Sequence, residues 1–565
     1  MNYIWEPKLL PSEAIIEKLR RELHLSQTTA TLLAQRGITT YDEAMHFFSP
    51  SLASLHDPFL MKDMHKAVAR LSKAINTQEK ILIYGDYDVD GTSAVSLLYR
   101  YLSNHTSLLY TYIPDRYTEG YGISFQGIDY AASKGCSLII ALDCGIKAID
   151  KVQYATDKGI DFIIGDHHRP DAQVPDAVAI LNPQQADCSY PYKELCGCGI
   201  GFKLVQAYQQ HLSRPFEEIR PLLDLVAIAT AADIVAMNGE NRTLTYFGLE
   251  VINQQPSAGV SALLGENQKR VGIGDVVFKA APRINAAGRI EHGKYAVALL
   301  IETDSQKAKE KAYEIELLNS ERKELDSSIT QEALAQIEEN GEQNRYSTVV
   351  FNPHWHKGVI GIVASRLIET YYRPTLVFTQ SGDKYAASAR SITGFDIYDA
   401  LEQCSEYLEQ FGGHTYAAGL TLLPEQYPDF KEAFEQIVAQ KLANLPRDPK
   451  ICYDTQLPLS KITEKLIGVL KRFEPFGPNN LPPLFYADNV IDTGFAKAIG
   501  KDEKHLKLNL REVGCPHYFG AVAFDLAARL PIVQSGRPFS IIYSIEENIW
   551  NGIIRPQLRI HDIKA

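Results

Sequence analysis

The sequence lacks several features that would place it in a specialised class of protein. In its 565 residues no apolar run reaches the roughly 18 residues that a membrane span needs. The first residues, MNYIWEPKLL, contain no apolar stretch of the kind found in signal peptides. The 8 cysteines are too few and too scattered for a disulfide framework in a chain of this length. We therefore expect a cytoplasmic globular protein with no membrane partner.

Two further patterns are missing. Cys196 and Cys198 flank Gly197, but no second pair of cysteines or histidines stands at the spacing of zinc ligands, so we interpret this segment as a tight turn of small residues. Positive charge is not in excess either, because 69 Asp and Glu outnumber 57 Lys and Arg and give a net charge of -12. This balance argues against a protein coated with basic surface. A local basic groove would still be enough to bind nucleic acid.

Short apolar runs alternate with helical patterns along the first half of the chain. The runs at 81–84, 138–142 and 162–164 are continuous rather than alternating, and helical patterns separate them, the first beginning near Ser93. This arrangement is typical of an α/β fold with a doubly wound parallel sheet. Residues 302–340 are charged, helical in pattern and nearly free of glycine, which predicts a long helix between two lobes.

A second α/β segment follows this helix, and the tail has short β patterns such as HLKLNL and FSIIYSI that predict a small β-barrel. A chain of this length has room for roughly three or four domains. We divide it into an N-terminal segment of two short amphipathic helices (1–60), a first α/β domain (61–300), a connecting helix (301–345), a second α/β domain (346–445) and a C-terminal barrel (446–565).

Acidic and imidazole side chains follow all three predicted strands of the first domain. GDYDVDG (85–91) follows the first strand, and the next two strands end at an aspartate and at an Asp-His-His run; the residues are Asp86, Asp88, Asp90, Asp143, Asp166, His167 and His168. The carboxyl ends of parallel strands meet at one edge of the sheet. Carboxylates this close together repel one another unless a cation or a proton lies between them.

The ligand types narrow the choice of cation. Carboxylate and imidazole without thiolate favour Mn²⁺ or Mg²⁺ over structural zinc. Two such ions, roughly 3.5–4 Å apart, would activate a water and stabilise the leaving oxygen in phosphodiester cleavage. A calcium loop is the alternative for DxDxDG, but the twelfth position, where an EF-hand has glutamate, is Leu97. We therefore predict a centre of two divalent ions.

A fourth element is the apolar helix predicted over 222–237, which carries Asp224 and Asp233. At 3.6 residues per turn these two carboxylates lie about 180° apart around the helix, so only one can face the metals. We choose Asp233, near the end of the apolar run, and leave Asp224 a capping or ion-pair role.

These motifs occur in the order found in a known family. GDYDVDG, DCGI (143–146), DHH (166–168) and LVAIATAADIV (225–235) resemble the motifs of the DHH phosphoesterases. PRINAAGR (282–289), WHKGVIGIVASRL (355–367), SARSITGFDI (388–397) and FGGHTYAAG (411–419) resemble the RecJ branch of that family, and the tail is similar to its OB-fold domain. The resemblance runs from about residue 25 to the end. One departure is Pro478-Asn479-Asn480-Leu481, where the family usually has a Gly-Asn-Pro turn.

The resemblance implies a doubly wound DHH domain, a DHH-associated domain that binds the phosphates of a strand, and a set of functional residues. The implied metal ligands are Asp88, Asp90, Asp143, His167 and Asp233, with Asp86 and His168 adjoining them. The implied phosphate-binding residues are Arg283, Arg289, His356, Arg366, Ser388, Arg390 and His414. Any one arginine could equally form a structural ion pair. Trp355, Tyr117 and Tyr121 could stack on bases or belong to the core.

The function that the resemblance implies is 5′-to-3′ hydrolysis of single-stranded DNA to mononucleotides, in DNA repair and recombination. It also implies a single-strand-binding protein and a helicase as partners. The alternative enzyme is a DHH phosphodiesterase acting on short oligonucleotides or cyclic dinucleotides, whose members generally lack the OB-like tail. A binding or scaffold protein on a decayed DHH fold is a third hypothesis, against which the intact acids and histidines argue.

Overall fold

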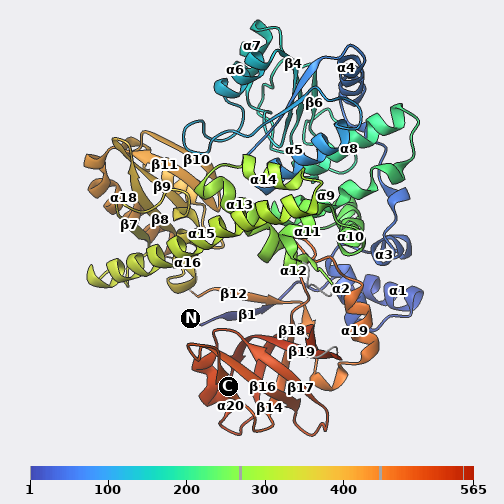
Figure 1. The fold of residues 1–565 in the computed structure, drawn as a ribbon. Coiled ribbons are helices and arrows are strands. Elements are labelled where there is room, and N and C mark those ends of the chain that lie inside the picture. The colour runs from blue at the N-terminus through green and yellow to red at the C-terminus, as the bar shows by residue number, and fades with distance from the viewer. Residues whose placement is uncertain (1, 266–269, 444–447, 551–552) are drawn as a thin grey trace. The chain divides into compact units, whose positions relative to one another are not determined.

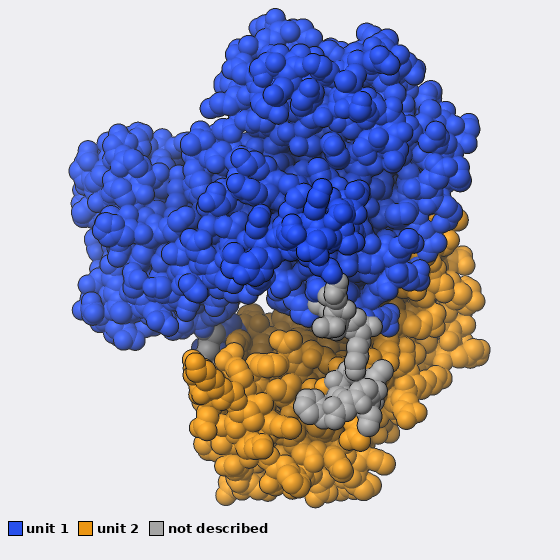
Figure 2. Space-filling model, in the orientation of Figure 1, with its two compact units in different colours: residues 1–2, 57–233, 248–449 blue, residues 3–56, 234–247, 450–565 orange. Residues whose placement is uncertain are grey.

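The computed structural model describes residues 2–265, 270–443, 448–550 and 553–565 (Figure 1). The chain forms two compact units, which Figure 2 shows in different colours. The first comprises 1–2, 57–233 and 248–449, and the second comprises 3–56, 234–247 and 450–565. Unit 1 therefore contains both α/β domains, and unit 2 joins the N-terminal helices to the C-terminal barrel.

Unit 1 begins with a five-stranded parallel sheet. Its strand order is β3 (Leu109–Tyr112), β2 (Lys80–Gly85), β4 (Cys136–Leu142), β5 (Asp161–Gly165) and β6 (Ala179–Leu181). The sheet lies between α6 (Phe125–Lys134) and α7 (Ile149–Asp157) on one face and α4 (Met64–Asn76), α5 (Val89–Leu102) and α8 (Gly197–His211) on the other (Figure 1). The doubly wound parallel sheet and its three predicted strands are confirmed, and β3 and β6 are additional strands.

The helix expected near Ser93 starts earlier, so that prediction was wrong. It begins at Val89 because Asp88 caps it: the Asp88 carboxylate accepts the backbone N–H groups of Asp90 at 2.9 Å and Gly91 at 3.1 Å. Capping carboxylates of this kind satisfy donors that the first helical turn leaves open. The acidic loop is thus part of the helix N-terminus.

The helix predicted over 222–237 is also shorter than expected. It is α9 (Leu223–Ala232), and it stops because Ile234 has a positive φ of 58°. The chain continues through α10 (Gly239–Gln254), α11 (Ala258–Leu264), α12 (Ile273–Asp275), the π-helical turn η5 (Val276–Ala280), α13 (Ala281–Ile290) and α14 (Lys294–Leu300). The charged segment then forms α15 (Ser305–Glu339), which confirms the predicted long helix.

The second α/β domain of unit 1 contains a five-stranded sheet in the order β10 (Gln410–His414), β11 (Ala417–Leu422), β9 (Lys384–Arg390), β8 (Thr375–Ser381) and β7 (Thr348–Phe351). Only the β7–β8 pair is parallel. Helices α16 (Ile360–Thr370), α17 (Ile397–Glu402) and α18 (Tyr427–Leu442) accompany the sheet. A core of aromatic and aliphatic side chains, including Phe378, Phe430 and Phe434, holds it together.

Unit 2 contains more elements at its N-terminal end than we expected. Instead of two helices there are three, α1 (Glu13–Leu23), α2 (Gln27–Gln35) and α3 (Tyr41–Phe48), preceded by β1 (Ile4–Pro7). Strand β1 pairs in parallel with β12 (Lys450–Tyr453), a partner remote in sequence that local patterns could not reveal.

The tail is a closed barrel, as predicted. Its five strands are β14 (Phe485–Asp492), β18 (Phe539–Trp550), β19 (Ile553–Lys564), β17 (Tyr518–Ala523) and β16 (His505–Glu512), and β16 pairs back with β14. The unusual turn at 478–481 is structural: buried Asn480 donates to the carbonyls of Phe473 and Pro475 and accepts from Arg36 Nε at 2.7 Å. In the part of the chain described, no helix combines the length and apolarity that crossing a bilayer requires.

Candidate metal centre

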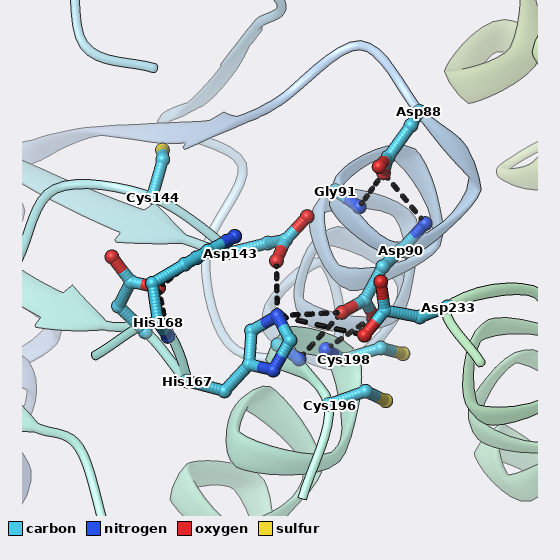
Figure 3. Close-up of polar contacts among 12 residues, drawn as sticks. Asp88, Asp90, Gly91, Asp143, Cys144, His167, His168, Cys196, Cys198 and Asp233 are labelled. Carbon is cyan, nitrogen blue, oxygen red and sulfur yellow. Dashed lines mark hydrogen bonds and ion pairs between the residues drawn. The ribbon is translucent and has the colours of Figure 1, made fainter. Parts of the chain in front are cut away.

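Four of the predicted ligands converge at the carboxyl edge of the first sheet (Figure 3). His167 Nε2 lies 3.2 Å from Asp143 Oδ1, 3.5 Å from Asp233 Oδ2 and 4.0 Å from Asp90 Oδ2. These side chains come from the ends of β4, β5 and α9 and from the first turn of α5. The topology of the sheet therefore brings together residues that stand far apart in the sequence.

Several polar atoms at this edge have no hydrogen-bond partner within the described chain although they are buried. They are Asp86 Oδ2, Asp143 Oδ1, His167 Nε2 and Asp233 Oδ2. Leaving one such atom unsatisfied costs about 1–3 kcal/mol. Four in one place are better explained by divalent cations, for which oxygen and imidazole nitrogen are suitable ligands.

Two groups of three side chains, among the residues described, offer ligand atoms within 4.8 Å of one another: Asp143, His167 and His168, and Asp90, His167 and Asp233. The groups share His167. The cysteines nearby are poor metal ligands, because burial and neighbouring carboxylates raise the pKa of the Cys144 and Cys196 thiols well above the ordinary value. The donor set thus fits Mn²⁺ or Mg²⁺.

The electrostatics of the cluster also favour cation binding. Burial, and then the charges of Asp90, Asp88 and Asp233, raise the pKa of Asp143 well above its usual range. Burial and the charges of Asp90 and Asp88 raise the pKa of Asp233 to about 9. Burial lowers the pKa of His167, which keeps its imidazole neutral and able to bind a metal. Bound cations would relieve this repulsion.

Asp90 is held by the N-terminus of α8. The backbone N–H groups of Gly197 and Cys198 donate to its two carboxylate oxygens at 2.6 and 2.8 Å. A helix N-terminus favours anions, since its amides are free and its dipole is positive there. Our interpretation of this segment as a tight turn was wrong, because Cys196 caps a helix. The glycine-rich start of a helical pattern was the signal that we missed.

Gly197 has no room for a side chain. A Cβ there would lie 2.5 Å from the Asp143 Cβ, closer than real Cβ atoms approach. The glycine therefore lets α8 approach two of the clustered aspartates at once.

His168 lies beside the centre in a hydrogen-bonded chain. Its Nδ1 is 2.7 Å from Asp166 Oδ1 and its Nε2 is 2.9 Å from the hydroxyl of Tyr121. Burial lowers the pKa of His168, but the hydrogen bond to Asp166 and the charges of the neighbouring carboxylates together outweigh burial, and the net shift is upward. Tyr121 is 55% exposed, so it is not a core residue. Both nitrogens of His168 thus have protein partners, unlike His167 Nε2.

Asp224 lies away from the cluster. It is fully buried, and its carboxylate lies 3.1 Å from Arg100 Nη1 and accepts the backbone N–H of Ser257 at 3.1 Å. It therefore forms the ion pair that the sequence had left open. Asp233 lies at the other end of the same helix, where α9 ends.

A second cluster is cationic. Arg390 Nη1 donates to Ser388 Oγ at 3.0 Å, and Arg289 Nη1 donates to the carbonyl of Gly358 at 3.0 Å. Burial, and then the nearby charges of Arg116, Arg390 and Arg322, lower the pKa of Arg289 to about 10. Burial and Arg116 also lower the pKa of Arg390. Three of the predicted phosphate-binding residues, Arg289, Ser388 and Arg390, are therefore neighbours.

Arg116 is a member of this cationic cluster that the sequence reasoning did not select. Its guanidinium lies 4.6 Å from the centre of the Tyr87 ring, in the acidic loop. Burial and the charge of Asp88 raise the pKa of Asp86, and the charge of Arg116 partly opposes that rise. The same charge contributes to the lowered pKa of Arg289 and of Arg390. Arg116 is therefore the member of the cationic cluster that also lies near the acidic loop. Its position directly before Tyr117 in PDRYTEGYG was the available signal.

The other predicted phosphate-binding residues have different surroundings. Arg283 pairs with Glu316, and Arg366 lies 2.7 Å from buried Asp326. His356 is half-buried against Tyr117, whose hydroxyl donates to the carbonyl of Arg289, and His414 is exposed at the end of β10. Their part in phosphate binding stays a prediction. Trp355 is a core residue, buried and donating from Nε1 to Glu332 at 2.8 Å.

The chain is similar to known proteins over nearly its whole length. Family models match at residues 80–230 (DHH family, N-terminal domain), 343–440 (DHHA1 domain) and 453–562 (RecJ OB domain). The single-stranded-DNA-specific exonuclease RecJ of Bacillus subtilis is 37% identical over 557 residues, which are 98% of this chain and 70% of that protein. The RecJ of Haemophilus influenzae is 33% identical over 91% of this chain and 92% of its own.

Solved structures agree. The crystal structure of RecJ from Thermus thermophilus in complex with Mn²⁺ matches with a TM-score of 0.83 and 26% identity, over 99% of this chain and 79% of that one. A manganese-bound structure of exonuclease RecJ matches with a TM-score of 0.60 and 30% identity, over 70% of this chain and 97% of that one.

Proposed function

Because the chain belongs to the RecJ family of single-stranded-DNA-specific exonucleases, we propose that it degrades single-stranded DNA from the 5′ end and releases mononucleotides. The protein is a metal-dependent exonuclease of the DHH phosphoesterase type. The direction of digestion, the individual residue roles and the partners are our proposals. The observation that carries the direction of digestion is a half-buried cationic cluster near the metal centre.

We propose that Asp88, Asp90, Asp143, His167 and Asp233 hold two divalent ions, with Asp86 adjoining them. When bound, the ions supply Lewis acidity for the attacking water and positive charge for the leaving oxygen. The chain's own contribution is to fix the ligands before binding. The α8 amides orient the Asp90 carboxylate, and burial keeps His167 neutral.

The neighbouring groups orient His168. Asp166 accepts from Nδ1, so Nε2 faces the loop that carries Tyr121. We propose that this chain of hydrogen bonds places His168 against the scissile phosphate, where Nε2 exchanges its contact with the Tyr121 hydroxyl for one with a non-bridging oxygen.

The 5′ end is selected, in this proposal, by Arg116, Arg289, Arg390 and Ser388. Burial and mutual repulsion of the guanidiniums lower the pKa values of Arg289 and Arg390, and within the described residues none of the three arginines forms an ion pair with a carboxylate. Such a site favours a group of high negative charge. A terminal phosphate carries more charge than an internal phosphodiester, so it binds here and presents the next bond to the metal centre.

We propose that the DHH domain (61–300), the connecting helix (301–345) and the DHH-associated domain (346–445) form the catalytic part. The OB barrel (446–565) would bind the rest of the strand. A hollow of about 690 Å³ on the barrel is lined by Lys497, Lys507, Arg555 and the exposed rings of Phe495 and Tyr518. Cations and exposed aromatic rings together suit single strands without sequence preference.

The test uses purified protein, Mn²⁺ and single strands labelled at either end. Label at the 5′ end should appear at once as mononucleotide, whereas label at the 3′ end should stay in long products until late. Release that begins at the 3′ end would refute the polarity.

A second experiment tests the cationic cluster. Strands with a 5′ phosphate should be cut faster than strands with a 5′ hydroxyl, and Arg390→Gln should remove that preference. Arg283→Gln is the matched control, since Arg283 pairs with Glu316 and should keep the preference. Loss of the preference in both variants would contradict the assignment.

The alternative substrate is a short oligonucleotide or a cyclic dinucleotide. The match to the RecJ OB domain at 453–562 supports a long single strand as the substrate rather than a dinucleotide. A long single strand should therefore compete strongly against a dinucleotide substrate. Weak competition would favour the alternative.

We also propose that the enzyme works in the cytoplasm with a single-strand-binding protein and a helicase, as the resemblance implies. Affinity purification of the tagged protein from its own cells after DNA damage should recover both. Recovery of neither would argue against this assignment.

A further inference from the structure

One helical rod leads away from the cationic cluster. Helix α12, the turn η5 and helix α13 follow one another without a break from Ile273 to Ile290, and the residues at both junctions keep right-handed helical dihedrals. Arg289 lies near the C-terminal end of this rod. That end also abuts the acidic loop, since a Cβ on Gly288 would lie 2.6 Å from the carbonyl of Tyr87.

One face of the rod is accessible to solvent from Phe278 to Arg289. Phe278 is exposed, and Pro282, Asn285 and Arg289 are partly exposed. Their spacing of four, three and four residues places them on one side of a helix. Of the residues between them, Ala281, Ile284 and Ala287 are among those buried, whereas Lys279 is exposed and Arg283 is partly exposed. We call the four accessible residues the α13 stripe.

Phe278 is the unusual member of the stripe. Its ring is 80% exposed, which is more than any other phenylalanine in the described part of the chain. It lies in η5, a π-helical turn, and such turns are rare and are frequent at functional sites. Turn η5 also packs against α9, the helix that ends at Asp233 of the metal centre.

The distance along the rod sets the place of Phe278 on a bound strand. Eleven residues at a rise of 1.5 Å put Phe278 about 16 Å from Arg289 along the axis. That is too far for the terminal nucleotide, whose phosphate Arg289 would hold, and suits a base a few nucleotides further along.

We infer that Phe278 is a base-stacking residue that binds the DNA strand on the 3′ side of the cleaved bond. Pro282 and Asn285 lie between Arg289 and Phe278 on the α13 stripe and would contact the nucleotides between them. Stacking on an aromatic ring tolerates any base, as an exonuclease without sequence preference requires. The inference rests on the proposed function, because it takes Arg289 to lie at the 5′ end.

The test compares Phe278→Ala with Phe278→Trp. The alanine variant should raise the KM for long single strands roughly tenfold with kcat nearly unchanged, because stacking on one base is lost. The tryptophan variant should restore the KM. A 5′-phosphorylated dinucleotide, too short to reach the ring, should show no change in KM with either variant.

Tyr313→Ala is the matched control. Tyr313 is also an exposed aromatic residue, 66% accessible, but it lies on α15 in a hollow that none of the four stripe residues lines. It should leave both KM values unchanged. Because Phe278 is so exposed, its replacement should leave the melting temperature unchanged, which thermal unfolding checks.

A fluorescent base analogue locates the contact. With 2-aminopurine at successive positions of a bound strand, wild-type protein in Ca²⁺ should quench one internal position, and Phe278→Ala should abolish that quenching. An unchanged KM for long strands, an equal rise for the dinucleotide, or quenching at the 5′-terminal base would overturn the inference. Digestion from the 3′ end by wild-type protein would instead refute the proposed polarity, and the long-strand KM would still test Phe278.

Discussion

Asp224 and Asp233 lie on one apolar helix, and their replacement should have opposite consequences. Asp224→Ala removes a fully buried carboxylate that pairs with Arg100 and accepts the backbone N–H groups of Leu225 and Ser257. Breaking a buried pair by removing one partner costs about 3–5 kcal/mol, since the other charge is left uncompensated. At about 2–4 °C per kcal/mol, the melting temperature of the catalytic domain should fall by roughly 10 °C.

Asp233→Asn should not lower the melting temperature in the absence of metal. Ligand atoms of Asp90 and Asp233 lie within 4.8 Å of each other, and Asp233 Oδ2 has no hydrogen-bond partner among the described residues. At that separation two unit charges would repel by ~3 kcal/mol for an effective dielectric constant near 20. The pKa of about 9 means that Asp233 avoids this repulsion near neutral pH by holding a proton when no metal is bound. Asparagine resembles that neutral carboxyl group, so the melting temperature in chelator should stay equal to or above that of the wild type, whereas Mn²⁺ binding and activity should be lost.

Two measurements on each purified variant separate these effects. Thermal unfolding followed by circular dichroism, in chelator and then in Mn²⁺, gives the stability and its increase on metal binding. Isothermal titration with Mn²⁺ gives the affinity. At temperatures below its own melting temperature, the Asp224→Ala variant should bind Mn²⁺ with the affinity of the wild type. The melting temperature of the Asp233→Asn variant should not increase when Mn²⁺ is added.

The reasoning would be refuted if Asp224→Ala lost Mn²⁺ affinity at unchanged stability in chelator. It would be refuted equally if Asp233→Asn melted well below the wild type in chelator yet still bound Mn²⁺. Either result would mean that the helix presents the other carboxylate to the metals.

Two further predictions concern residues that the structure places in unexpected roles. Gly197→Ala should lower Mn²⁺ affinity and kcat by at least an order of magnitude, because the added Cβ would collide with Asp143. Gly199→Ala should be tolerated, since the nearest atom to its added Cβ is 3.4 Å away. Titration with Mn²⁺ and measurement of turnover check both variants. Trp355→Phe should lower the free energy of unfolding by roughly 2 kcal/mol, because the hydrogen bond to Glu332 is lost. The variant's affinity for single strands should be unchanged in a binding assay, which would distinguish a core role of Trp355 from base stacking.

The sequence alone was enough for the acidic edge of the first sheet. Apolar runs that end in aspartate or histidine are local patterns, and the geometry of parallel strands brings their carboxyl ends together whatever the rest of the chain does. Helix periodicity likewise separated Asp224 from Asp233. The long helix α15 and the barrel were also predictable, because the helical pattern of the one and the β patterns of the other are local features of the sequence.

Only the tertiary structure decided which groups support and surround that edge. Gly197 binds Asp90 through its backbone N–H, a contact between residues more than a hundred positions apart that leaves no side-chain signal. Arg116 joins Arg289 and Arg390 because a loop of one domain meets the other, while Arg283 pairs with Glu316. A sequence states which charges a chain carries. Which of them are neutralised by a partner and which are left for a substrate depends on contacts that form only when distant segments pack together.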